Sequence, residues 1–213
     1  MKNQNHQHPQ ERQPHFRKER TLVVIKPDGV QRSLIGEIIE RFECTGLKLV
    51  GIKMLVPDDA FVETHYTFDP EWKRKAGEKS IAGYTAKGIT PPVNDPVAAG
   101  ERILGSLKSY LTSGPVVAMV WQGAHAVPIV RKLVGGTEPF SSDVGTIRGD
   151  YVIDSYEMSG SDGRAIRNLI HASGNVDEAK QEIPHWFAAN ELIDYSLVQE
   201  KILYDVNLDG LKG

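Results

Sequence analysis

Residues 167–182 read Arg-Asn-Leu-Ile-His-Ala-Ser-Gly-Asn-Val-Asp-Glu-Ala-Lys-Gln-Glu and place His171 just before a predicted helix. Asn175, with Glu178 three residues later, forms a variant of the capping box that marks the start of a helix. Apolar residues then recur at helical spacing. Glu182 falls about two turns into this helix, from where its carboxylate can project back toward the histidine.

A histidine that acts as a nucleophile needs a neutral ring with one nitrogen free. An acceptor must therefore hold the N–H of the other nitrogen, and Glu182 is placed to be that acceptor. The ordinary alternative is a capped helix preceded by a histidine that merely satisfies its own hydrogen bonds. These sixteen residues alone leave the two interpretations about equally open.

Three further stretches shift the balance toward chemistry. Residues 20–31 read Arg-Thr-Leu-Val-Val-Ile-Lys-Pro-Asp-Gly-Val-Gln, residues 113–121 read Ser-Gly-Pro-Val-Val-Ala-Met-Val-Trp, and residues 145–150 read Gly-Thr-Ile-Arg-Gly-Asp. Together with Asn-Leu-Ile-His-Ala-Ser at 168–173, they resemble the signatures of the nucleoside diphosphate kinase family, in the family's order. The resemblance covers most of residues 20–195, and four motifs in order are far more specific than one short pattern.

The resemblance implies a phosphohistidine enzyme that moves the γ-phosphate of a nucleoside triphosphate to a nucleoside diphosphate in a ping-pong reaction. His171 matches the nucleophile and Glu182 matches the residue that orients its imidazole, while Ser173 and Tyr66 match supporting positions. The other nucleotide-contacting positions are matched by Lys26, Arg131, Thr137, Arg148 and Asn168. Of these, the lysine and asparagine would reach the sugar and phosphates, and the others would hold the phosphates.

Cationic side chains suit this task because phosphoryl transfer asks a protein mainly for positioning and charge neutralisation. A guanidinium fork can hold two phosphate oxygens at once, which favours arginine. Taken singly, each of these residues is more often an ordinary surface charge, and their occurrence as a set favours the functional interpretation. His65, His125 and His185 match no nucleophile position and are expected to pack or to face solvent.

ATP is the implied phosphate donor, and Mg²⁺ is implied as an ion that bridges phosphate oxygens rather than occupying a protein cage. No cluster of acidic residues and histidines in the sequence indicates a dedicated metal site. The family commonly continues after its histidine with Gly-Ser-Asp, whereas this chain has Ala172-Ser173-Gly174. Any water-mediated metal contact that the missing acid would make is therefore in doubt.

The hydrophobic pattern predicts the order strand, helix, strand, strand, helix, strand. The four predicted strands are Leu22–Ile25, Leu47–Val56, Val116–Trp121 and Arg148–Ile153. This order leaves several folds with helices and strands open. The resemblance implies one of them, an α+β ferredoxin-like antiparallel sheet covered by helices, as a single domain over residues 19–213.

Two stretches are longer than the compact family pattern. An insertion is predicted at about residues 73–102, because compact members cross from the Tyr66 position to the third strand in a much shorter segment. We expect the insertion to fold as a helical flap, since a structureless loop of this length is uncommon. The flap would lie beside the nucleotide cleft or, alternatively, face a neighbouring subunit. Residues 154–163, rich in serine and glycine, form the second departure and are predicted to be a loop.

The insertion also disturbs the base pocket. In compact members an aromatic residue shortly after the Tyr66 position lines this pocket. Here Trp72 matches that position from the N-terminal side, and Ile103 or Leu107 from the C-terminal side. Trp72 is favoured because an indole face stacks on any base, although a tryptophan at this place can equally anchor the loop to the core.

Composition limits the other classes of function. A chain of 213 residues suits one domain, and a net charge of −3 gives no general attraction to nucleic acid or to anionic membranes. Cys44 is the single cysteine, which fits a reducing compartment. The sequence has no apolar run long enough to span a bilayer and no apolar signal region, so we expect a cytoplasmic protein. Residues 1–18 are polar and are predicted to form a disordered tail.

Two hypotheses from different classes remain. The first is an active nucleoside diphosphate kinase, which the resemblance implies to be a homo-oligomer, either a hexamer or a tetramer. The second is a catalytically silent interaction or regulatory module on the same fold. The joint presence of His171, Glu182 and the cationic set argues for the first. A P-loop kinase is disfavoured because no Gly-x-x-x-x-Gly-Lys-Ser/Thr sequence occurs.

Overall fold

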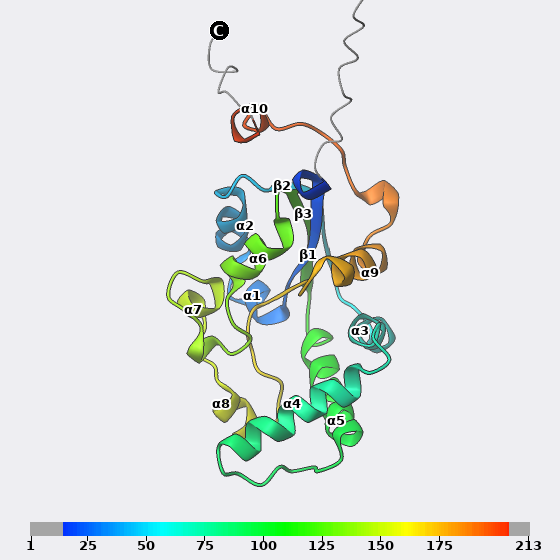
Figure 1. Cartoon of the computed structure of the whole chain (residues 1–213), viewed down its shortest axis with the longest axis vertical. Coiled ribbons are helices and arrows are strands. Elements are labelled where there is room, and N and C mark those ends of the chain that lie inside the picture. The colour runs from blue at the N-terminus through cyan, green and yellow to red at the C-terminus, as the bar shows by residue number, and fades with distance from the viewer. Residues whose placement is uncertain (1–14, 205–213) are drawn as a thin grey trace, which may run out of the picture.

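The centre of the molecule is a four-stranded antiparallel sheet in the order β2-β3-β1-β4, seen in a computed structural model that describes residues 15–204 (Figure 1). Its strands are β1 (Glu19–Ile25), β2 (Lys48–Leu55), β3 (Val116–Gly123) and β4 (Ile170–Ala172). β1 pairs with β3 along its whole length, and its other edge pairs with β4, where His171 lies opposite Val24. The expected α+β ferredoxin-like plan is confirmed.

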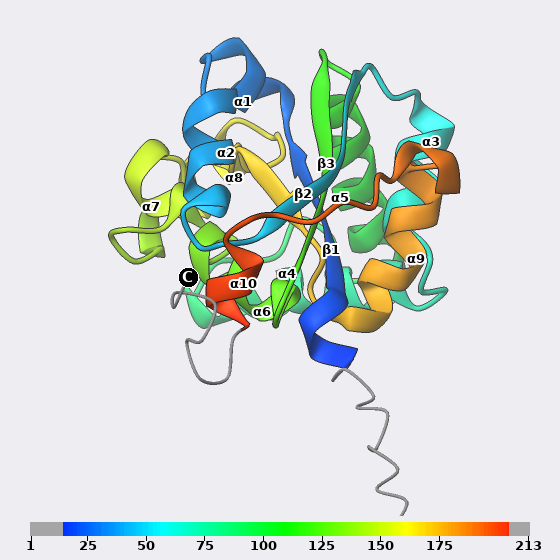
Figure 2. The ribbon, with the colours of Figure 1, turned by 90° about the horizontal axis from the view of Figure 1, so that it is seen from above.

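Helices cover both faces of the sheet because β1 and β3 are apolar on both faces. On one face, Val23 and Ile25 pack in a core with α2 (Ile35–Glu43) and α6 (Ala126–Val134). On the other face, Leu22 and Val24 pack with Trp186 and its neighbours from α9 (Val176–Trp186) and α3 (Asp59–Tyr66). Figure 2 shows the two helix layers on opposite sides of the sheet. Ile170 and Ala172 of β4 belong to the first of these two cores.

Shorter elements complete the chain. They are α1 (Pro27–Gln31), α7 (Ile147–Tyr151), α8 (Tyr156–Ser161), α10 (Glu200–Leu203) and the 3-10 turns His15–Lys18, Pro139–Ser141 and Ala189–Glu191. Most of the predicted tail lies outside the described residues, which begin with the first of these turns. Within residues 15–204, every helix is too short or too polar to cross a membrane.

The predicted strand at Arg148–Ile153 is wrong. Most of this stretch forms α7, because the Thr146 side chain accepts the Gly149 N–H and caps a helix there. A Cβ on Gly149 would lie 2.2 Å from the Asp143 carbonyl oxygen, so the helix packs tightly against the preceding loop. The fourth strand is instead β4, which carries His171.

The predicted insertion is helical, as expected, but its helices extend beyond residues 73–102. They are α4 (Trp72–Ala86) and α5 (Pro96–Leu111), which form a hairpin that extends away from the sheet (Figure 1). The predicted loop at 154–163 contains α8, which is capped by the Ser155 side chain. A Cβ on Gly160 of α8 would lie 3.6 Å from the Tyr84 hydroxyl of α4. The two departures from the compact pattern are thus neighbours in space.

Two glycines let α4 and α5 cross closely. A Cβ on Gly77 would lie 1.8 Å from the Pro96 carbonyl oxygen, and one on Gly100 would lie 1.9 Å from the Lys73 carbonyl oxygen. Both obstacles are backbone atoms, which cannot rotate away as a side chain can. The hairpin therefore depends on the absence of side chains at these two positions.

We expect Gly100→Ala to lower the free energy of unfolding by about 1–3 kcal/mol, the usual cost of overpacking. Gly105→Ala is the matched control on α5, since a Cβ there meets nothing within 4 Å. That control should be neutral or stabilising by up to about 1 kcal/mol, because alanine is the better helix former. Urea unfolding measures both. Equal stability of the Gly100→Ala variant and the parent would mean that the helices do not cross as closely as described.

Candidate active site

His171 lies at the middle of β4, with its side chain directed to Glu182 in the second half of α9. Its Nε2 lies 2.8 Å from Glu182 Oε1, and the other carboxylate oxygen, Oε2, accepts the Ser173 hydroxyl at 2.6 Å. Asn175 caps α9 by accepting the Glu178 N–H, as the sequence predicts. The capped helix start thus fixes the distance between the imidazole and the carboxylate, and Glu182 contacts both His171 and Ser173.

The charge state of this triad follows from its surroundings. Burial alone would raise the pKa of Glu182, but His171, His65 and the Ser173 hydroxyl together lower it to about 2. The carboxylate is therefore ionised at neutral pH and can only accept hydrogen bonds. The imidazole must then carry its proton on Nε2, which leaves the Nδ1 lone pair free. The arrangement fits a nucleophile that reacts through Nδ1.

His65 is part of the site, although sequence analysis expected only packing or solvent contact for it. Its ring lies edge-on to His171 with the centroids 4.6 Å apart, and its Nδ1 accepts the Trp186 indole N–H at 3.2 Å. Burial and the neighbouring His171 lower the pKa of His65 to about 3, so it stays neutral. His185 does pack as expected, stacked on Phe61. The one sequence signal for His65 is its place beside Tyr66.

Lys26 enters the site from the end of β1. Its ammonium donates to Asn168 Oδ1 at 2.7 Å, and Asn168 Nδ2 in turn donates to the Thr137 carbonyl at 2.9 Å. Burial, followed by the nearby Arg148, lowers the pKa of Lys26 to about 7. Three of the predicted residues are thus joined in one chain of hydrogen bonds, and the lysine in it gains a strong electrostatic preference for an anion.

Arg148 is almost fully occupied by backbone. Its guanidinium donates to four carbonyl oxygens, which belong to Gly135, Gly136, Asn168 and Ile170. A guanidinium has five N–H groups, so about one remains for a phosphate oxygen. Arg148 can therefore bind a phosphate through two N–H groups, as predicted, only if one of its hydrogen bonds to a backbone carbonyl is given up. In the free protein Arg148 joins α7 and the 135–136 turn to β4.

Arg131, on α6, is the freer cation. No ion pair forms to it among the described residues. Its charge acts on Arg148: burial, and next to it Arg131, lower the pKa of the Arg148 guanidinium to about 10. Two guanidinium groups that repel each other without a nearby carboxylate favour a bound anion between them. This is the electrostatic setting expected for phosphates.

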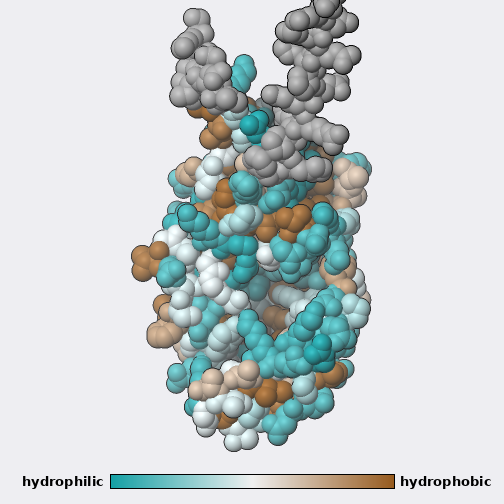
Figure 3. Space-filling model, in the orientation of Figure 1, coloured by the Kyte–Doolittle hydropathy of each residue, from teal (hydrophilic) through white to brown (hydrophobic). Residues whose placement is uncertain are grey.

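Tyr66 and Trp72 form an aromatic pair where α3 leads into α4. Their ring centroids are 5.6 Å apart with the planes inclined at 45°. Burial, followed by Glu182, raises the pKa of the Tyr66 phenol, so the hydroxyl stays neutral. In the view of Figure 3, the surface between α4 and the sheet is mostly hydrophilic. Trp72 thus adjoins a predicted site residue, whereas Ile103 and Leu107 lie further along, on α5.

The described residues contain one group with metal-ligand character, formed by His65, His171 and Glu182. Its donor atoms lie within 4.8 Å of one another. Three lone pairs of this group are already used, because His65 Nδ1 accepts the Trp186 indole N–H and Glu182 accepts hydrogen bonds from both His171 and Ser173. The geometry fits a hydrogen-bonded triad better than a metal cage.

Comparisons with known proteins agree with this geometry. The family model described as nucleoside diphosphate kinase matches residues 19–78 and 97–192, which leaves the end of α4 and the following loop unmatched. A nucleoside diphosphate kinase from Pyrobaculum aerophilum is 48% identical over 180 residues, covering 83% of this chain and 98% of the relative. The crystal structure of an NDP kinase from the same organism matches with a TM-score of 0.80 at 45% identity, over 83% of this chain and 100% of that one.

A second solved structure is more distant. It is a nucleoside-diphosphate kinase from Borrelia burgdorferi, solved as a transition state mimic with bound vanadate and ADP. It matches with a TM-score of 0.71 at 36% identity, over 86% of this chain and 95% of that one.

Proposed function

The chain belongs to the nucleoside diphosphate kinase family, and from this premise we propose that it transfers the γ-phosphate through His171. The chain is a phosphotransferase with nucleoside di- and triphosphates as substrates. The observation that carries the assignment of the nucleophile is the 2.8 Å contact between His171 Nε2 and the ionised Glu182. This contact fixes the tautomer that exposes Nδ1.

In the first half-reaction, the Nδ1 lone pair attacks the γ-phosphorus of the triphosphate. The bond from phosphorus to the bridging oxygen breaks, and the nucleoside diphosphate leaves with the electron pair. In the second half, a terminal oxygen of an incoming diphosphate attacks the same phosphorus, and the electron pair of the N–P bond returns to Nδ1. The Nε2 proton stays on the ring throughout, and Glu182 stabilises the positive charge that the ring acquires.

The proposed roles of the other residues follow from where they lie. Lys26 and Asn168 would bind the sugar and phosphates as a preformed pair, and Arg131 would neutralise phosphate charge with the remaining N–H of Arg148. Thr137 and Tyr66 would contribute hydroxyl donors, and Ser173 would hold Glu182. Removing a charge-stabilising donor of this kind commonly costs about a hundredfold in rate.

Mg²⁺ is proposed to bind through the phosphates of the nucleotide. Hard divalent cations prefer oxygen ligands, and Mg²⁺ commonly reaches a protein through substrate phosphates. The Glu182 carboxylate next to the nucleophile already accepts two hydrogen bonds, from His171 and Ser173. Gly174, which stands where the family commonly has an acid, supplies no oxygen from a side chain. When bound, the ion would shield phosphate charge during transfer.

The decisive experiment is incubation with triphosphate labelled in the γ-phosphate. We expect acid-labile phosphate on the protein, stoichiometric with folded sites, that is removed by adding a nucleoside diphosphate. The competing hypothesis of a silent regulatory module predicts nucleotide binding at most, without labelled protein. Since many groups hold phosphate and sugar and none reads a base edge, several different diphosphates should remove the label at similar rates.

Trp72 is proposed as the base platform. Trp72→Ala should weaken nucleotide binding by about 1–3 kcal/mol, the usual worth of one stacked base. Trp72→Phe retains an aromatic face and should bind nucleotide within a few-fold of the parent. Nucleotide should quench the tryptophan fluorescence of the parent, and this variant should lose most of that quench. The other two tryptophans, Trp121 and Trp186, are at most 2% exposed, so they should respond little. Undiminished binding by Trp72→Ala, together with loss of the oligomer, would assign the hairpin to assembly instead.

Assembly and location remain proposals. Ile52, Met54 and Val56 are each about half exposed or more, and they lie on or beside the edge strand β2. An apolar edge of this kind favours covering by a second copy of the chain. Light scattering on the purified protein would distinguish a hexamer or tetramer from a monomer. A cytoplasmic location also stays a prediction.

A further inference from the structure

Tyr110 on α5 contacts two segments of the site at once. Its hydroxyl donates to Asp28 Oδ1 at 2.6 Å, and the Lys26 ammonium lies 5.1 Å from the centroid of its ring. Asp28 Oδ2 accepts the Leu169 N–H at 3.2 Å, and the Leu169 carbonyl accepts the Lys26 N–H at 2.7 Å. Leu169 has a left-handed φ of 62° and lies two residues before His171. Tyr110 thus supports both the lysine and the turn that leads into β4.

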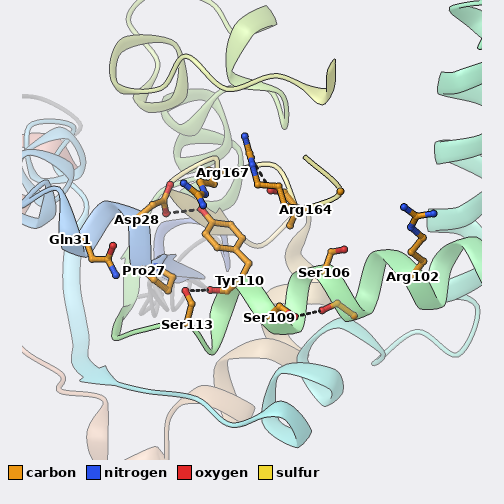
Figure 4. Close-up of a pocket in the computed structure, with 13 residues that line it drawn as sticks. Pro27, Asp28, Gln31, Arg102, Ser106, Ser109, Tyr110, Ser113, Arg164 and Arg167 are labelled. Carbon is orange, nitrogen blue, oxygen red and sulfur yellow. Dashed lines mark hydrogen bonds between the residues drawn. The ribbon is translucent and has the colours of Figure 1, made fainter. Parts of the chain in front are cut away.

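The far side of Tyr110 borders a pocket. This pocket, of about 560 Å³, lies between α1, α5 and residues 163–167, and Tyr110 lies near the middle of its lining, between Asp28 and Ser106 (Figure 4). Lys26 does not line the pocket and is only 5% exposed. The phenol ring therefore lies between the lysine ammonium and a space large enough for many water molecules.

The charges around Lys26 explain why this shielding matters. Arg148 on α7 repels its ammonium, His65 on α3 stays neutral, and Asp28 on α1 attracts it. Asp28 is itself committed to Tyr110 and Leu169. The negative face of an aromatic ring stabilises a desolvated ammonium without neutralising it. A lysine held this way keeps its charge available for an incoming phosphate.

We propose that Tyr110 is a positioning residue for phosphoryl transfer, which holds Lys26 against its ring and separates it from the water of the adjoining pocket. This inference rests on the role proposed above for Lys26. Tyr110 comes from α5, the helix that the hairpin holds in place, so it also links the inserted hairpin to the nucleotide site. Sequence analysis assigned Tyr110 no role.

The test compares Tyr110→Leu with Tyr110→Phe. The leucine variant loses the ring, so its KM for nucleotide should rise about ten- to thirtyfold, with kcat changed far less, in line with a desolvated cation–π contact. The phenylalanine variant keeps the ring and should stay within about threefold of the parent, because a single neutral hydrogen bond contributes little. A KM for Tyr110→Leu equal to that of the parent would overturn the proposal, as would an equal rise in both variants.

A pH profile separates positioning from general loss of structure. Burial is the largest cause of the low pKa of Lys26, so water admitted by Tyr110→Leu should outweigh the lost ring contact and move the pH at which nucleotide affinity falls upward from about 7. In Tyr110→Phe the profile should match the parent. An unchanged profile in the leucine variant contradicts the shielding role. Should that variant fail to fold, Tyr110→Met fills more of the space and serves the same comparison.

Tyr195 provides a matched control. Its ring lies 5.3 Å from the Lys48 ammonium and its hydroxyl donates to the Leu49 carbonyl at 2.7 Å, so it pairs a tyrosine ring with a lysine away from the site. Tyr195→Leu should leave KM and the pH profile unchanged. Lys26→Met tests the role of the lysine separately from that of the tyrosine. Parent-like kinetics of Lys26→Met would refute the proposed role of the lysine, whereas an impaired Lys26→Met beside a parent-like Tyr110→Leu would refute only the inference about the tyrosine.

Discussion

His171→Ala is expected to abolish phosphoryl transfer, with a loss of about four orders of magnitude or more, as is usual when a covalent nucleophile is removed. The substitution deletes the ring whose free Nδ1 is proposed to form the bond to phosphorus. The side chain belongs to neither apolar core and lies on the edge strand β4, so the fold should survive. Nucleotide affinity should be nearly unchanged, because the phosphate-binding cations remain in place.

The measurement is single-turnover labelling from γ-labelled triphosphate, with nucleotide binding followed separately. His185→Gln is the matched control. This histidine also lies near His65, but it stacks on Phe61 and hydrogen-bonds the Phe61 backbone carbonyl. The control should label like the parent. Acid-labile phosphate on the His171→Ala protein at the parent's rate would show that another group is the nucleophile.

The triad could be predicted from sequence because its parts are local. His171 and Glu182 are eleven residues apart, and the Asn175 cap with Glu178 fixes where the intervening helix starts. Once the helix start is known, the periodicity places Glu182 on the turn that faces the histidine. Apolar residues at helical spacing also run through α6 and stop at Gly135, which is its C-cap. Short-range geometry of this kind follows from the chain alone.

The region around Arg148 shows where local signals fail. Apolar and β-branched residues surround it, so the pattern resembles a strand, but the Thr146 cap and the carbonyl oxygens around the guanidinium favour a helix. β4 has only three residues, too few to show any period. The motif around His171 can therefore be recognised from the sequence, whereas the hydrophobic pattern predicts no strand there.

Contacts between segments far apart in the chain could not be predicted from the sequence. Tyr110 and Asp28 are 82 residues apart, and His65 and Trp186 are 121 apart. From sequence alone, Tyr110 is one polar-tipped residue on an amphipathic helix, and nothing indicates that it faces the Lys26 turn. Only the packing of the hairpin against the end of β1 brings it there. The sequence thus predicts which residues react more readily than which residues support them.

Glu182→Gln is expected to slow the phosphorylation of His171 about a hundredfold without weakening nucleotide binding. An amide oxygen can still accept the Nε2 proton and hold the ring, but it lacks the charge that stabilises the ring as the N–P bond forms. Glu178→Gln is the matched control, four residues earlier on α9, where the carboxylate accepts the Gly174 N–H at the exposed helix start. That variant should phosphorylate within a few-fold of the parent.

The charge on Glu182 also gives the prediction a pH signature. Its pKa is depressed to about 2 from an ordinary 4.5, so its ionised form stabilises the folded protein above pH 4.5, and this contribution is lost as pH falls toward 2. The difference in free energy of unfolding between the parent and Glu182→Gln should therefore shrink over that window in acid unfolding experiments. Stopped-flow phosphorylation at neutral pH provides the kinetic half. An unchanged rate would remove Glu182 from the mechanism even if the stability difference followed the expected pH dependence, because the carboxylate would then support the fold and not the developing charge.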